Sequence, residues 1–90
     1  MRHATQQDLV HLETLLAELR ELPELQERKR GSFSRGSKAF LHFHAEASDL
    51  YVDVRLDSSF ERMRVTSREE QTVFLAQVQR ALGRASAIER

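Results

Sequence analysis

Leucines recur every three or four positions near the start of the chain, which is the spacing of one face of an α-helix. The stripe consists of Leu9, Leu12, Leu16 and Leu19, widened by Leu15 and Leu22. Thr5 is a suitable N-cap, and Asp8 in the first turn favours the positive end of the helix dipole. Because Pro23 cannot continue a helix, the pattern predicts a helix over residues 5–22.

Two segments in the middle of the chain alternate between apolar and polar residues, as half-buried strands do. In residues 38–45 one face carries Ala39, Leu41, Phe43 and Ala45, and the other carries Phe40, His42 and His44. In residues 50–56 one face carries Leu50, Val52, Val54 and Leu56, and the other carries Tyr51, Asp53 and Arg55. The four residues between the segments, 46–49, suit a hairpin loop, so we expect a β-hairpin.

The loop length predicts the register of this hairpin. If Ala45 lies opposite Leu50, the two apolar faces coincide, as a sheet with one buried face requires. The polar residues then form an outer sheet face on which His44 pairs with Tyr51, His42 with Asp53 and Phe40 with Arg55. Since an opposing carboxylate favours the charged imidazole, this register predicts a raised pKa for His42.

Further elements flank the hairpin. Residues 60–65 suit a strand with Met63 and Val65 inward and Arg62 and Arg64 outward. Residues 27–35 are either a first strand with a bulge at Gly31 or a mobile basic loop. A last helix is indicated by two overlapping capping boxes that begin at Thr66 and Ser67, and Gly83 is its expected end.

Together these elements predict an α+β fold of one domain. We expect a two-layer α-β(3–4)-α sandwich, in which an antiparallel sheet of three or four strands is covered on one face by both helices. Residues 1–90 form that single domain, because 90 residues cannot supply two cores. The ordered part is expected over residues 5–84, and residues 85–90 are expected to fray.

Composition excludes several classes of protein. The chain has no cysteine, so it has no disulfide framework and no thiolate metal site. No apolar run approaches the roughly 20 residues of a membrane span, and we expect a cytoplasmic protein without a membrane partner. The net charge is zero, whereas dedicated nucleic-acid-binding domains usually carry a basic excess.

The outer sheet face is the main candidate for a binding surface. Its expected members are Phe40, His42, His44, Tyr51, Asp53, Arg55, Arg62 and Arg64. Aromatic side chains among charged ones favour self-association, as a homodimer, or contact with a partner. Nucleic-acid or polyanion binding is the alternative, with help from a basic stretch made up of Arg28, Lys29, Arg30, Arg35 and Lys38.

A metal site is a further alternative. Residues two apart on a strand share a face, so His42 and His44 can approach one ion, and Asp53 on the neighbouring strand is the candidate third ligand. His3 and His11 are expected on or before the first helix, away from this pair. No catalytic motif is recognised and no cofactor is indicated, so the sequence favours binding over catalysis.

The order of elements and two short motifs resemble the MmcQ/YjbR-like family of small bacterial proteins. The motifs are residues 38–41, Lys-Ala-Phe-Leu, and residues 50–55, Leu-Tyr-Val-Asp-Val-Arg. The resemblance covers residues 20–83 and implies a frataxin-like sandwich with a proposed DNA-binding role. The chain departs from the family in its shorter length, its lack of tryptophan and the Phe43-His44 ending of its strand.

Overall fold

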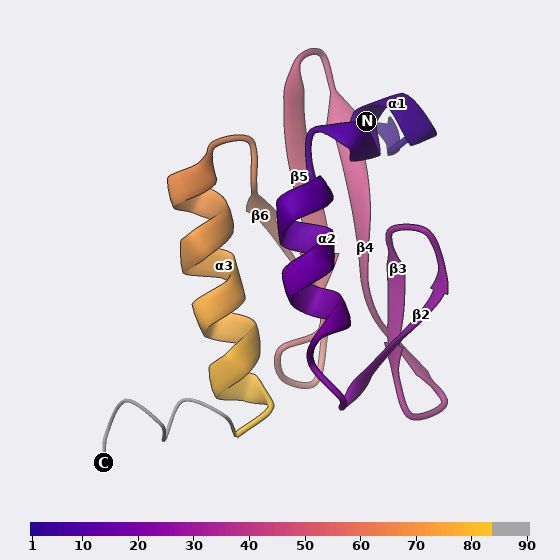
Figure 1. The fold of residues 1–90 in the computed structure, drawn as a ribbon, viewed down its shortest axis with the longest axis vertical. Helices are drawn as coiled ribbons and strands as arrows, with labels where there is room; N and C mark the ends of the chain where they lie inside the picture. The colour runs from indigo at the N-terminus through magenta and orange to yellow at the C-terminus, as the bar shows by residue number, and fades with distance from the viewer. Residues whose placement is uncertain (84–90) are drawn as a thin grey trace.

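A computed structural model describes residues 1–83 and shows an antiparallel sheet with three helices (Figure 1). The elements in chain order are β1 (Arg2–His3), α1 (Gln6–Val10), α2 (Glu13–Arg20), β2 (Leu25–Lys29), β3 (Ser32–Arg35), β4 (Lys38–Glu46), β5 (Asp49–Val54), β6 (Glu61–Arg64) and α3 (Arg68–Ala81). The predicted α+β class is therefore confirmed. The predicted fraying of residues 85–90 lies outside the described residues.

Within residues 1–83 the sheet has six strands, so the predicted three or four strands were too few. Five of them follow one another in the order β2-β3-β4-β5-β6, and β1 pairs with β4. Residues 27–35 do not form one strand with a bulge at Gly31. They belong to a tight hairpin of β2 and β3, because Gly31 adopts a left-handed φ of 84° and reverses the chain there.

The hairpin of β4 and β5 has the predicted register. Phe43 lies opposite Val52, His42 opposite Asp53 and His44 opposite Tyr51. Next to β5, the neighbouring strand β6 places Arg62 opposite Asp53. The outer sheet face therefore carries the polar residues that the sequence predicted there, namely His42, His44, Tyr51, Asp53 and Arg62.

Phe40 is the exception on β4, and its prediction as an outer-face residue was wrong. Its side chain is 3% exposed and belongs to the hydrophobic core. The pairing of β3 with β4 steps from Phe33–Leu41 to Ser34–Ala39 and passes over Phe40. This bulge shifts the alternation by one residue, so Phe40 turns inward and Ala39 is exposed.

One hydrophobic core joins the helices to the sheet. It includes Leu15, Leu16 and Leu19 of α2, Phe74 and Val78 of α3, and alternate residues of β4 and β5. The helices α2 and α3 contact each other and lie side by side in Figure 1. A sandwich with both helices on one face of the sheet requires such a shared core. The placement of both helices on one face stays a prediction.

The predicted first helix is divided in two. The amides of His11 and Leu12 donate to the carbonyls of Asp8 and Leu9, three residues back, so the chain tightens between α1 and α2. Thr5 caps α1 and Ser67 caps α3, each through a reciprocal capping box. Within residues 1–83, no helix has the length and apolar character to cross a membrane.

Candidate metal centre

Three of the four histidines meet on the outer sheet face. His42 and His44 lie two residues apart on β4 and therefore share a face. The short strand β1 pairs with the end of β4 and places His3 opposite His44. We call His3, His42 and His44 the histidine cluster.

The cluster is compact enough to surround one ion. One ring nitrogen of each histidine lies within 4.8 Å of a ring nitrogen of the other two. The ring centroids are 4.7 Å apart for His3 and His44, 4.7 Å for His42 and His44, and 5.7 Å for His3 and His42. The three side chains therefore converge on a shared space from two neighbouring strands.

Local contacts fix the strand that supplies His3. The backbone amide of Ala4 donates to the carbonyl of Phe43 at 3.0 Å, which continues the pairing of β1 with β4. The guanidinium of Arg2 donates to the carboxylate of Asp8, which also accepts from the Thr5 amide at 2.8 Å. The cap of α1 thus ties β1 to the rest of the domain.

A carboxylate lies beside the cluster. Asp53 Oδ2 is 3.0 Å from His44 Nε2 and 3.7 Å from His42 Nε2. Both oxygens of Asp53 accept from Arg62, at 2.7 Å from Nε and 2.8 Å from Nη2. The hydrogen bond from Arg62 holds the pKa of Asp53 below its usual range, so this carboxylate is a fixed negative charge near neutral pH.

His44 is the most buried member of the cluster, at 8% exposure. Although its Nε2 is 3.0 Å from Asp53 Oδ2, the two form no hydrogen bond, and among residues 1–83 this buried nitrogen has no hydrogen-bond partner. A buried polar atom without a partner costs free energy, and an ion bound beside the His44 ring can offset that cost.

The predicted rise in the pKa of His42 was wrong. Burial lowers the pKa of His42, and the neighbouring His44 lowers it further, while Asp53 acts in the opposite direction. The register was right, but His42 faces other imidazoles as well as the carboxylate. A neutral imidazole is the form that binds a metal.

The other predicted outer-face residues have partners within the chain. Arg64 is bound to Asp49 and Glu70, and Arg62 to Asp53. Arg55 lies 4.5 Å from the centre of the exposed Phe60 ring. Tyr51 is half-buried opposite His44 and Arg64. Because these carboxylates neutralise Arg62 and Arg64, the face is less basic than its arginines suggest.

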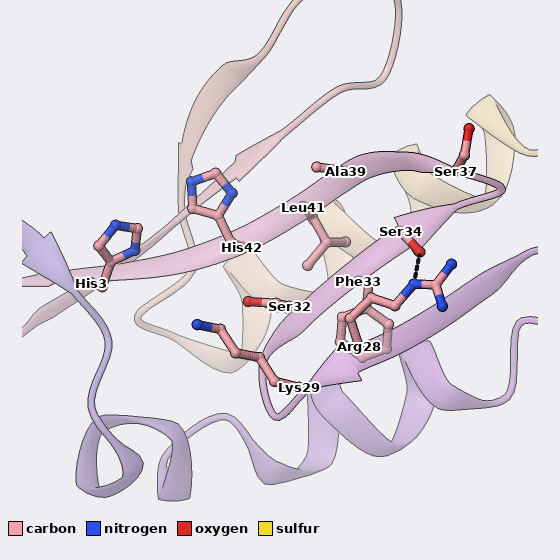
Figure 2. A pocket seen from close by; sticks show the side chains of 10 residues that line it. All are labelled: His3, Arg28, Lys29, Ser32, Phe33, Ser34, Ser37, Ala39, Leu41 and His42. Atoms are coloured by element: carbon pink, nitrogen blue, oxygen red, sulfur yellow. Dashed lines mark hydrogen bonds between the residues drawn. The ribbon is translucent and has the colours of Figure 1, made fainter.

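The predicted basic stretch is divided between three places. Arg28 and Lys29 of β2 line a cavity beside His3 and His42, which Figure 2 shows. Arg30, between the strands, donates to Gln6 and Glu13 of the first two helices. Arg35 and Lys38 lie opposite each other at the exposed ends of β3 and β4.

His3 is the functional candidate that sequence reasoning missed. A strand of two residues has no periodic pattern, so the N-terminal segment was expected to lead only into the helix. The signal that could have found it is weak: His3 precedes the Thr5 cap by two residues, and a short extended segment before a helix can add to a sheet.

The chain matches no protein-family model, no curated protein and no solved structure in the three comparisons made. The resemblance to the MmcQ/YjbR-like family therefore stays a prediction.

Proposed function

We propose that the protein binds a divalent transition-metal ion through His3, His42 and His44. The observation that carries this proposal is the convergence of one nitrogen from each histidine within 4.8 Å on a single sheet face. Imidazole nitrogen suits zinc, copper, iron and nickel, whereas magnesium and calcium prefer oxygen ligands. Zinc is the first ion to test.

The surroundings of the cluster support this function. Asp53 lies where a carboxylate can accept a hydrogen bond from one nitrogen of His44 while the other nitrogen binds the ion, an arrangement that metal sites often use. Its charge also offsets the charge of the ion. The unpaired Nε2 of His44 supports the site, because an ion held at the other ring nitrogen, Nδ1, would fix the ring where Nε2 donates to Asp53.

Binding requires a small adjustment of the rings. Zinc bonds to histidine nitrogen are about 2.0–2.1 Å long, so nitrogens around a tetrahedral ion lie roughly 3.3 Å apart. The nitrogens of the cluster lie within 4.8 Å of one another and must move closer by up to about 1.5 Å. Side-chain rotation of His3 and His42, which are not fully buried, supplies this movement.

The test is zinc binding by untagged protein that a chelator has freed of metal. We expect one zinc ion per chain by calorimetry, with NMR shifts confined to the rings of His3, His42 and His44. His44→Ala should weaken zinc binding more than about 100-fold, beyond the effect of losing a residue that only supports a ligand. His3→Ala and His42→Ala should also weaken it strongly.

The matched control is His11→Ala, which removes the one histidine outside the cluster. His11 ends α1 and is exposed, so this variant should bind zinc as the unmodified protein does. The proposal fails if the unmodified protein binds no stoichiometric zinc. It also fails if zinc binding survives the double substitution of His42 and His44 by alanine.

The sequence ranked two other roles above a metal site, and both have lost support. Self-association rested partly on Phe40, which is buried in the core. Polyanion binding rested on arginines, of which Arg62 and Arg64 are paired with carboxylates. Both roles stay untested predictions, and light scattering and a salt-dependent DNA titration remain their direct tests.

A further inference from the structure

A row of polar residues crosses the sheet from β2 to β6 through the histidine cluster. Lys29 lies opposite Ser32, Ser32 opposite His42, His42 opposite Asp53 and Asp53 opposite Arg62. Directly opposed residues of antiparallel strands point to the same face. The row therefore places a lysine and a serine on the β3 side of the histidines, and the Asp53–Arg62 pair on the other side.

The surface at the Lys29 end of this row is concave. A cavity of about 380 Å³ lies beside the cluster and is lined by His3, His42, Lys29, Ser32 and Arg28, among others. In Figure 2 the Lys29 amine and the Ser32 hydroxyl point toward the end of the cavity where His3 and His42 lie. A volume of this size is within the range of small-molecule sites.

The cavity has an unbalanced positive charge. Among the described residues, no carboxylate lines it or the smaller cavity next to it, which His3, Lys29, Ser32 and His42 also line. Within residues 1–83, the Lys29 amine has no hydrogen bond or ion pair. In the described part of the chain, Arg28 donates to two neutral oxygens, those of the Ser34 hydroxyl and the Gly36 carbonyl. A ligand that complements this lining is an anion.

The cavity also has an apolar part. Ala39 and the methylene stems of Arg28 and Lys29 supply it, whereas Phe33 and Leu41, which also border the cavity, have side chains that belong to the hydrophobic core. A ligand that fills the space therefore combines an anionic group at one end with an apolar body. An inorganic anion alone would leave the apolar part to water.

We propose that this cavity binds a small organic oxyanion, a carboxylate or a phosphate monoester, whose acidic oxygen coordinates the metal while Lys29 and Ser32 bind the same group. The inference rests on the proposed function, because three histidines leave a coordination position open to the cavity. The positive charge of Lys29 and the metal together select an anion over a neutral molecule of the same shape.

The probes are benzoate and phenyl phosphate, which share an apolar ring and differ in the acid group, with benzyl alcohol as the neutral control. Cobalt(II) replaces zinc so that coordination of the anion changes the visible spectrum. We expect saturable spectral changes with at least one of the two acids and none with benzyl alcohol. NMR shifts of the Lys29 and Ser32 amides should saturate at the same concentrations.

Lys29→Ala should weaken binding of the acid about tenfold or more, because it removes a charge-assisted hydrogen bond. Lys38→Ala is the matched control, since the chain has only these two lysines and Lys38 does not line the cavity. Lys29→Arg should keep most of the affinity. The relative affinities of benzoate and phenyl phosphate indicate which acid group the natural ligand carries.

The outcomes separate the two proposals. If cobalt does not bind, the proposed function itself fails. If cobalt binds but neither acid changes its spectrum, only the oxyanion inference is overturned. The inference is also overturned if Lys29→Ala and Lys38→Ala bind the acids equally well, or if benzyl alcohol binds as tightly as benzoate.

Discussion

At the scale of single residues, Asp53 links the histidine cluster to the edge of the sheet. Its carboxylate faces His44 and His42, and Arg62 fixes it from the other side. Replacing it by asparagine keeps the shape and removes the charge. We predict that Asp53→Asn weakens zinc binding about 10–100-fold, the usual effect of losing a carboxylate that supports a ligand. Calorimetry with zinc measures this change.

Asp49→Asn is the control for this prediction, because Asp49 also pairs with an arginine on the same sheet but lies outside the cluster. It should leave zinc affinity unchanged. An unchanged affinity in Asp53→Asn would show that the carboxylate has no part in the site. Complete loss of binding would make Asp53 a direct ligand, as the sequence suggested with His42 and His44.

The sequence predicted His42, His44 and Asp53 together because the hairpin register follows from the loop length and the apolar pattern. It could not predict the inward turn of Phe40, since the bulge there arises in the pairing with β3, which the residue pattern of β4 does not reveal. The sequence also could not predict the direction of the His42 pKa shift, because burial and His44 lower this pKa and oppose the effect of Asp53.

At the scale of elements, the junction of β1 and α1 decides whether His3 reaches the cluster. Asp8 accepts from Thr5 within the capping box and from Arg2 in β1. The hydrogen bond from Arg2 is the largest cause that lowers the pKa of Asp8, far below its ordinary value. The charged form of Asp8 therefore stabilises the fold.

We predict that Asp8→Asn lowers the thermal unfolding temperature by a few degrees at pH 7. A lowered folded pKa gives stability that is present above the unfolded pKa of about 3.9 and is lost as pH falls below it. The difference between the variant and the unmodified protein should therefore be constant above about pH 5 and shrink below about pH 4. Thermal melts by circular dichroism across this range provide the measurement.

Asp57→Asn, in the exposed turn after β5, serves as the comparison and should melt as the unmodified protein does. A difference for Asp8→Asn that stays the same from pH 7 to pH 3 would contradict a role for its charge. The capping box was visible in the sequence as Thr5 and Asp8. The strand it anchors was not, because Arg2 and His3 alone carry no pattern.

At the scale of the whole molecule, the histidine cluster joins the start of the chain to the middle of the sheet. The stripes of apolar residues were sufficient to predict an α+β domain with a central antiparallel hairpin. They could not predict the six-stranded sheet, because β2 and β3 are short and their turn depends on the single residue Gly31. The site therefore depends on contacts distant in sequence, which periodicity does not encode.

A metal that binds the folded chain and not the unfolded one must stabilise this arrangement. At a free zinc concentration 100 times the dissociation constant, the gain is about 2.7 kcal/mol. For a domain of this size, that gain raises the unfolding temperature by roughly 10–20 °C. We predict such a rise in calorimetry with zinc relative to a chelator, and no comparable rise with magnesium, which prefers oxygen ligands.

The double substitution of His42 and His44 by alanine should abolish the zinc-dependent rise, while His11→Ala should retain it. Because the core of residues 1–83 is built from hydrophobic side chains and not from the metal site, the chelated protein should still unfold cooperatively, at its own lower temperature. A rise of equal size in the double variant would place the stabilising ion elsewhere on the chain. Since β1 and β4 are joined only in the folded state, zinc should raise the free energy of unfolding by holding these two strands together.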